Sequence, residues 1–269
     1  MYFRPTPETA ETLGMAGSRY LNVPNPSACS VCRSPLRSGL RAWWDAPSGH
    51  LECGACRPEL SAPGASAQRE GERRYANRDQ RTRTNHPVVG GILMAARERP
   101  QHEQSWLTGA EGERRVGKML EDLAPNGVRV VHDRAVLASK ANIDHIAVSP
   151  TGIYVIDTKF HEGKRVELKA PLFGRARLRV GGRENTKLVT GMAKQVSTVR
   201  LATNFDVPVT PVVCFLAATW PMFSTSFSID GVRVCGPKVL RRWLTRPGNL
   251  SPATVDETFR AILRHTRPA

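Results

Sequence analysis

Three charged residues interrupt an apolar stretch between residues 142 and 159, whose sequence is NIDHIAVSPTGIYVIDTK. Asp144 lies within the first apolar run, and Asp157 and Lys159 follow the second. The Pro-Thr-Gly sequence between the runs is typical of a turn, so the stretch is predicted to form a β-hairpin. Because an unpaired charge is costly in a buried strand, these groups must either face water at the strand ends or take part in chemistry.

The spacing of these residues suits a divalent cation. Pairing of the two strands would bring Asp144 and Asp157 together, where two carboxylates repel each other unless a cation lies between them. Lys159 shares a strand face with Asp157, and the carbonyl of Thr158 could add an oxygen ligand. Mg²⁺ or Mn²⁺ held by carboxylates beside a substrate phosphate is the arrangement expected for phosphodiester hydrolysis. The alternative is a pair of solvated aspartates at strand ends and an ordinary lysine.

A helix predicted over residues 108–123 adds a third carboxylate. Thr108 and Glu111 have the spacing of a capping box, which gives Glu111 a structural role at the start of the helix. Glu113 lies on the same face as the apolar positions, and a carboxylate there requires a cation or a proton. The apolar positions follow helical spacing at Val116, Met119, Leu120 and Leu123.

The sequence after the hairpin predicts the rest of an α/β domain. A strand over residues 175–180 alternates Arg175, Arg177 and Arg179 with apolar residues, so one of its faces would present a row of guanidinium groups to phosphates. Gln195 borders the apolar face of a helix predicted over residues 186–203. Further strands and helices follow, and their order predicts a mixed β-sheet flanked by helices. The remaining predicted strands cover 128–133, 165–170, 210–218 and 232–235, and the remaining helices 237–245 and 251–266.

Four of the six cysteines have the spacing of a zinc site. Two Cys-x-x-Cys pairs are separated by twenty residues, which predicts a tetrahedral structural Zn²⁺ site completed by strands near residues 40–45 and 50–53. Arg33 and Arg57 stand where such knuckles often carry glycine. The alternatives are free thiols or redox-active pairs, while Cys214 and Cys235 are each predicted to be core residues of apolar strands. The predicted zinc ligands are Cys29, Cys32, Cys53 and Cys56.

Composition points to a polyanionic partner. The 269 residues carry a net charge of +15, and the excess is greatest between residues 107 and 203. Such a balance favours nucleic acid as a partner, with DNA expected, and the alternative is a basic protein without such a partner. The sequence shows no run long enough to span a membrane and no secretory signal, so no membrane partner and a cytoplasmic location are expected.

The chain is predicted to divide into five parts. A tail over residues 1–26 precedes the zinc-ribbon-like module at 27–58. A basic, partly disordered linker is expected over 59–104, with a short helix between residues 88 and 98 as an open alternative. The α/β domain is expected at 105–216, and residues 217–269 are expected to supply a strand and helices that pack on it.

The order of the segments GAEGE, IDHIAVSPTGIYVIDTK and AKQV resembles the nuclease-related domain, NERD, of the PD-(D/E)XK nuclease superfamily. The resemblance implies a restriction-endonuclease-like core, with a mixed sheet of four or five strands and the site at one edge. Glu113 matches the helical glutamate of the G-x-x-G-E motif, and Gln195 matches the helical glutamine. Asp144 matches the first strand aspartate, and Asp157 and Lys159 match the (D/E)-x-K pair, with aspartate where the family often carries glutamate.

These observations lead to the hypothesis of a metal-dependent nuclease that hydrolyses DNA and is targeted by a zinc ribbon. Asp144 and Asp157 would hold Mg²⁺ or Mn²⁺, and Glu113 would orient water or a second ion. Lys159 would stabilise negative charge, and Gln195 would hold Lys159 or the water. Two alternatives stay open: a nucleic-acid-binding protein with a decayed site, and an adaptor whose ribbon binds another protein.

Overall fold

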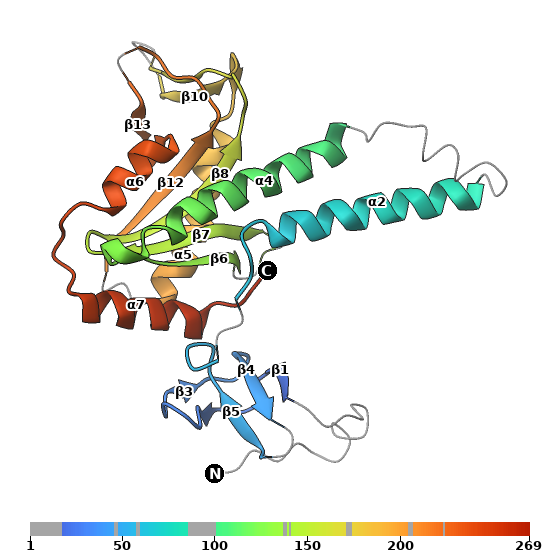
Figure 1. The fold of residues 1–269 in the computed structure, drawn as a ribbon, viewed down its shortest axis with the longest axis vertical. Helices are drawn as coiled ribbons and strands as arrows, with labels where there is room; N and C mark the ends of the chain where they lie inside the picture. Colours follow the sequence, from blue (N-terminus) through green and yellow to red (C-terminus); the bar gives the residue numbers. More distant parts are fainter. Residues whose placement is uncertain are drawn as a thin grey trace.

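A six-stranded mixed sheet forms the centre of the computed structural model, in the order β13-β14-β12-β8-β7-β6 (Figure 1). β6, β7 and β8 form an antiparallel meander, while β12 and β14 run parallel to β8. This confirms the predicted mixed α/β fold, with six strands rather than four or five. The strands are β6 (Arg129–Ala135), β7 (Asn142–Ser149), β8 (Gly152–Phe160), β12 (Val209–Leu216), β13 (Ser226–Ile229) and β14 (Val232–Cys235). The structure describes residues 18–45, 48–57, 60–85, 101–136, 139, 141–170, 174–203, 207–222 and 224–269.

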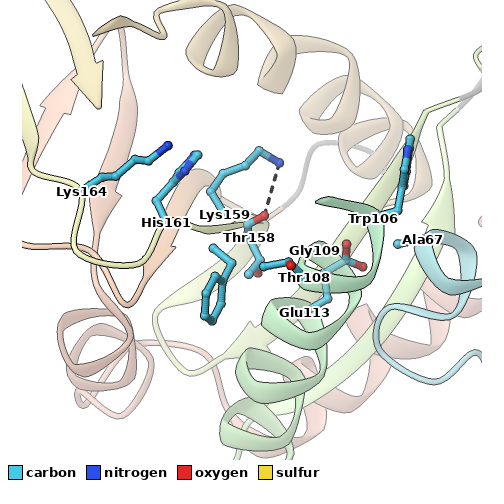
Figure 2. Close-up of a pocket in the computed structure, with 10 residues that line it drawn as sticks. Ala67, Trp106, Thr108, Gly109, Glu113, Thr158, Lys159, His161 and Lys164 are labelled. Carbon is cyan, nitrogen blue, oxygen red and sulfur yellow. Dashed lines mark hydrogen bonds between the residues drawn. The ribbon is translucent and has the colours of Figure 1, made fainter. Parts of the chain in front are cut away.

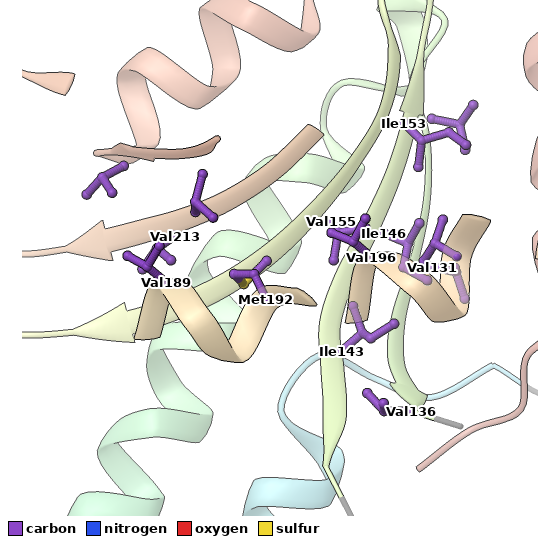
Figure 3. Packing of buried hydrophobic residues seen from close by; sticks show 14 of the residues in the cluster. Val131, Val136, Ile143, Ile146, Ile153, Val155, Val189, Met192, Val196 and Val213 are labelled. Carbon is purple, nitrogen blue, oxygen red and sulfur yellow. The ribbon is translucent and has the colours of Figure 1, made fainter. Parts of the chain in front are cut away.

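Helices cover both faces of the sheet, and the alternation of side chains along the strands explains the two buried clusters. Tyr154 and Ile156 of β8 pack toward α4 (Gln101–Glu121) and α6 (Pro237–Leu244). Ile153 and Val155 pack toward α5 (Lys187–Ala202) and α7 (Pro252–His265), as Figure 3 shows for α5. The last residues of β8 are therefore held between two helical layers. None of the helices that the structure describes is long and apolar enough to cross a membrane.

Helix α2 (Ala65–Asn85) replaces most of the predicted linker. Its sequence has no sustained apolar period, but Glu70 pairs with Arg73 and Arg74 on the next turn, and such pairs support an exposed helix. α2 lies alongside α4, and the two helices project from the body as a hairpin (Figure 1). Residues 65–85 of the predicted linker therefore form a helix. The alternative helix at 88–98 falls outside the described residues.

The start of α4 also differs from the prediction. The helix begins at Gln101, so Thr108 lies inside it and cannot act as its N-cap. Glu111 instead forms surface ion pairs with Arg114 and Arg115. The predicted capping box is wrong because residues N-terminal to Thr108 continue the helix, where they pack beside α2.

A second, three-stranded sheet consists of β9 (Val166–Lys169), β10 (Arg177–Val180) and β11 (Arg183–Glu184). Arg175 precedes β10, so the predicted row of three guanidinium groups on one strand is shortened to two. Arg177 forms an ion pair with Glu184 at 3.0 Å, and Arg179 donates to the carbonyl of Gly182 at 3.0 Å. The basic face exists, but it is partly engaged within its own sheet.

The N-terminal module is a set of short strands below the main body in Figure 1: β1 (Ser18–Asn22), β2 (Ser27–Ala28), β3 (Pro35–Leu36), β4 (Arg41–Asp45) and β5 (His50–Glu52). β4 and β5 are the two strands that the sequence predicted between the cysteine pairs. The module meets the body at a groove of about 230 Å³ that includes Arg41 of β4 and Arg264 of α7. The two parts therefore share a basic seam.

Candidate active site

The site lies at the ends of β7 and β8, beside α4. The antiparallel ladder between the two strands ends at the pair His145 and Ile156. Asp144 is the next residue of β7 beyond this pair. Its Oδ2 atom accepts a 2.7 Å hydrogen bond from the backbone N–H of Thr158 on β8. Asp144 is 6% exposed. Because the pairing of β7 with β8 ends before Asp144, its buried carboxylate can bind the backbone of Thr158.

Lys159 supplies the positive charge of the site. Its Nζ lies 2.7 Å from Oδ2 of Asp157 and donates to the carbonyl of Thr158 at 3.3 Å (Figure 2). Burial lowers the pKa of Lys159, but the attraction of Asp157, Asp144 and Glu113 outweighs it, so the pKa lies above its ordinary value. The ammonium is thus charged at neutral pH. The Thr158 carbonyl, which the sequence suggested as a ligand, already accepts one hydrogen bond.

Glu113 approaches the strand ends from α4 because of the glycine before it. A β-carbon on Gly112 would lie 3.0 Å from Cβ of Phe160, so glycine allows α4 to pack closely on β8. Glu113 is 8% exposed, and its Oε2 has no hydrogen-bond partner among the described residues. Burial above all, and then Asp144 and Asp133, raise the pKa of Glu113 to about 9.

The site holds more negative charge than its lysine neutralises. Burial raises the pKa of Asp144 to about 7, and repulsion by Asp157 adds to this, while Lys159 and the Thr158 N–H oppose it. A buried carboxyl group with a raised pKa and an unpartnered oxygen either keeps a proton or pairs with a cation. Carboxylate oxygens are hard ligands, so the donor set fits Mg²⁺ or Mn²⁺.

The fit is to an ion that keeps several waters. Among the described residues, the four cysteines are the group of three or more possible metal ligands whose ligand atoms lie close enough to share one ion. The carboxylate oxygens of Glu113, Asp144 and Asp157 are more widely spread. Mg²⁺ commonly uses one or two protein carboxylates and fills its other positions with water and phosphate. Asp144 and Asp157, with adjacent positions in the two strands, meet that need.

Gln195 makes no hydrogen bond to Lys159, the lysine that it was expected to hold, among the described residues. It is buried on α5, on the face that packs against the sheet, and its Oε1 has no hydrogen-bond partner within the described residues. Lys159 is held by Asp157 and Thr158 instead. A free buried amide oxygen is available for water, but the structure has no bond between Gln195 and Lys159.

Residues 108–216 match the family model of the nuclease-related domain, NERD.

The NERD match spans the whole site, from α4 through β12. A curated relative, an uncharacterized protein of Bacillus anthracis, is 36% identical over 66 residues, which cover 23% of this chain and 31% of the relative. The chain therefore spans under a third of that protein's length in the matched region. No solved structure gives a significant match.

Asp133 is a functional neighbour that the sequence did not reveal. It is fully buried, with a left-handed φ of 54°, within β6, where it is skipped in the pairing with β7. Its carboxylate accepts 2.8 Å and 2.9 Å hydrogen bonds from the Ser66 N–H and from Nδ2 of Asn142. Ser66 lies in the first turn of α2, so this contact satisfies an N-terminal donor of that helix. The His-Asp sequence that ends a predicted strand was the available signal.

A second unanticipated feature is a buried histidine pair behind Thr158. His145 Nε2 lies 3.1 Å from the Thr158 hydroxyl, the two Nδ1 atoms of His145 and His132 are 2.8 Å apart, and His132 reaches Glu121 of α4 at 3.1 Å. Burial first of all lowers the pKa of both rings, so they are neutral at neutral pH. This series of hydrogen bonds holds Thr158 in place. The backbone of Thr158 in turn binds both Asp144 and Lys159.

The four cysteines form a separate cluster that could hold a metal ion, outside the residues that match the NERD model. Their sulfur atoms all lie within 4.8 Å of one another, and those of Cys32 and Cys53 are 3.7 Å apart. A tetrahedral ion with Zn–S bonds of about 2.3 Å places its ligands about 3.8 Å apart. Cys29 Sγ accepts from the Cys53 N–H at 3.3 Å, and Arg33 takes the left-handed φ of 61° for which glycine is common. The cluster fits the predicted zinc.

The remaining two cysteines, Cys214 and Cys235, lie next to each other in the core. Cys214 and Cys235 are fully buried core residues, as expected. They are not isolated from each other, because they face each other across the parallel strands β12 and β14.

Proposed function

We propose that this chain is a metal-dependent nuclease that hydrolyses phosphodiester bonds in nucleic acid, with DNA as the expected substrate. The observation that supports this best is the set of buried and half-buried carboxyl groups of Glu113, Asp144 and Asp157 around one lysine, with the Oε2 atom of Glu113 unpartnered among the described residues. The match of residues 108–216 to a nuclease-related family supports the same reading.

Each side chain has a role that follows from its position. Asp144 and Asp157 would hold Mg²⁺ or Mn²⁺, which supplies a Lewis acid for the phosphoryl oxygen and lowers the pKa of water. A bound ion would displace the proton that Glu113 otherwise keeps, and its Oε2, which has no partner among the described residues, would then accept a hydrogen bond from the attacking water and could take its proton. Lys159 directs its ammonium at the negative charge that develops on the phosphate. Gln195 orients water through its free oxygen.

The decisive experiment is nicking of a supercoiled plasmid with Mg²⁺. The wild-type protein should nick it, and Lys159→Ala should lose about 10²- to 10³-fold in rate because one group that stabilises the transition state is gone. The metal ligands remain in that variant, so divalent-ion binding measured by calorimetry should persist. Lys118→Ala is the matched control, since Lys118 is an 80% exposed lysine of the same domain, on α4.

Three results would reject the proposal. Equal nicking by the wild type and Lys159→Ala would identify a contaminant. No nicking together with a salt-sensitive shift of DNA mobility would favour a binding protein with a decayed site, and neither effect would favour the adaptor.

The basic face next to the site should follow the phosphate backbone. Replacing Arg175, Arg177 and Arg179 with alanine should flatten the slope of log K against log salt on DNA. Because Arg177 is paired with Glu184, we expect a change of about 2 units rather than the 3 of three free contacts. An unchanged slope would place the nucleic acid on another surface.

A further inference from the structure

The pocket that contains Glu113 and Lys159 also has an aromatic rim. It is an open space of about 580 Å³ between the α2–α4 hairpin and the end of β8. Trp106 of α4 lies at one end, and Lys164, after β8, lies at the other (Figure 2). The ring side chain of Trp106 is 36% exposed. An exposed tryptophan at the mouth of a pocket is a surface that a ligand can cover.

Trp106 is held in a fixed position. It packs on α2 where that helix has a glycine, since a β-carbon on Gly71 would lie 3.5 Å from Cβ of Trp106. The guanidinium of Arg74 lies 5.1 Å from the centroid of the indole ring, a cation–π contact from the same helix. The hairpin therefore presents the ring without the loss of side-chain freedom that a loose residue would incur on binding.

Positive charge lines the remainder of the pocket. Lys159 and Lys164 both contribute to the wall, and Glu113 is the acidic residue among those that line it. Both lysines lower the pKa of His161, after burial as the largest cause, which shows that their charges reach the same space. An aromatic face at one end and two ammonium groups toward the other match the two halves of a nucleotide.

The size of the pocket determines whether single-stranded or duplex nucleic acid can enter it. The pocket volume lies in the range that encloses a small molecule, and the reacting groups Glu113 and Lys159 are inside it. A base within a duplex has both faces stacked, and extruding it costs a few kcal/mol. An unpaired base offers its face to Trp106 without that cost, and base–aromatic stacking is tolerant of sequence.

We propose that this pocket binds an unpaired nucleotide of single-stranded nucleic acid, with its base stacked on Trp106 and its phosphate between Lys159 and Lys164. The assignment of that phosphate as the one cleaved rests on the proposed nuclease function. The stacking site itself requires no cleavage. The chain would thus act on single strands, flaps or ends rather than on the interior of a paired duplex.

The test is a binding measurement in Ca²⁺, so that cleavage is not the readout. Fluorescence anisotropy is recorded for a labelled single-stranded DNA of about 15 nucleotides, the matching RNA and the DNA duplex. The wild type should bind a single strand more tightly than the duplex. Trp106→Ala should weaken single-strand binding by about tenfold, with less than a twofold change for the duplex.

Two further variants keep the result interpretable. Trp106→Phe retains an aromatic face and should recover most of the affinity, even if Trp106→Ala disturbs the hairpin. Tyr75→Ala is the matched control, because Tyr75 is a 39% exposed aromatic residue on the same hairpin, outside the pocket lining, and it should leave binding unchanged. Binding of either single strand supports the proposal, and the ratio between DNA and RNA identifies the sugar.

Equal binding of single strand and duplex by the wild type, or an equal loss for both in Trp106→Ala, would overturn the inference. These results are distinguishable from failure of the proposed function. A protein that prefers single strands through Trp106 but nicks nothing would retain the stacking site and lose only the nuclease assignment. A protein that nicks DNA without this preference would lose only the stacking site.

Discussion

The four-cysteine cluster and the carboxylate site each gather side chains that repel one another when ionised, but they are assembled differently. The cysteines come from two short turns of one small module, at residues 29–32 and 53–56. The carboxylates come from a helix and two strands, and the nearest two in sequence, Asp144 and Asp157, are separated by a whole hairpin. One centre is built by local chain geometry and the other by the packing of a domain.

The two regions also differ in what neutralises them. Lys159 supplies a cation within the carboxylate site, and a proton on Glu113 can remove one charge. The cysteine module has no such internal cation at its sulfurs, and burial above all raises the pKa of Cys53 and Cys56. From this comparison we expect the carboxylate site to fold without an ion and the cysteine module to require one.

The largest expected effect follows from removing the zinc. Structural zinc contributes about 10 kcal/mol or more to the folding of small zinc modules. Cys29→Ser should therefore lose the metal and unfold the zinc-ribbon-like module at residues 27–58, while strands β7 and β8 remain protected. Elemental analysis and hydrogen exchange provide the measurement. Val31→Ser, at an exposed position between Cys29 and Cys32, is the control and should keep zinc. Freshly purified protein without zinc would remove the distinction between the two centres.

A smaller and pH-dependent effect is expected for Glu113→Gln. The folded pKa of Glu113 is about 9, against an ordinary value of 4.5. Between these values the folded state keeps a proton that the unfolded state releases, so stability without Mg²⁺ falls as pH rises through this window. At pH 8, Glu113→Gln should be more stable than the wild type by roughly 1–3 kcal/mol, and the difference should vanish near pH 4.

Denaturant unfolding of the zinc-loaded protein at the two pH values, without added Mg²⁺, measures this difference. Added Mg²⁺ should stabilise the wild type more at pH 8 than at pH 6, because the ion competes with the proton. Parallel pH profiles for the two proteins would mean that Glu113 is not held in the acidic form, and that the site already has its charges balanced.

The smallest effect is expected two residues away on the same helix. Glu111 is a surface residue paired with Arg114 and Arg115, and its pKa is lowered by them. Glu111→Ala should shift the midpoint of thermal unfolding by less than about 2 °C and leave nicking unchanged. A large loss of stability would indicate that Glu111 supports the hairpin base. A loss of nicking would extend the site along α4.

The sequence predicted the elements with strong local signals. The cysteine spacing, the hairpin of residues 142–159 and the apolar faces of α4 and α5 all depend on neighbours within a few turns. Glu113 was found because a carboxylate on an apolar helical face is unusual. The orientation of these groups could not be predicted, because it depends on where the β7–β8 ladder ends and on how closely Gly112 lets α4 approach.

The errors have a common cause in tertiary contacts. Helix α2 lacks an apolar period of its own, and its first turn is satisfied by Asp133, which is distant in sequence. The start of α4 was placed at Thr108 because a capping box is a local pattern, yet packing against α2 extends the helix beyond it. His132 and His145 resemble ordinary strand residues until the two strands bring them together.

The Asp133 carboxylate connects helix α2 to strand β7, because it accepts hydrogen bonds from both Ser66 and Asn142. Helix α2 has 21 residues, so it forms an arm about 30 Å long with its base at this carboxylate. Asn142 lies two positions before Asp144 on β7. Ser66 and Asn142 both donate hydrogen bonds to the Asp133 carboxylate. The base of α2 and the strand that carries Asp144 are therefore tied to one point of β6.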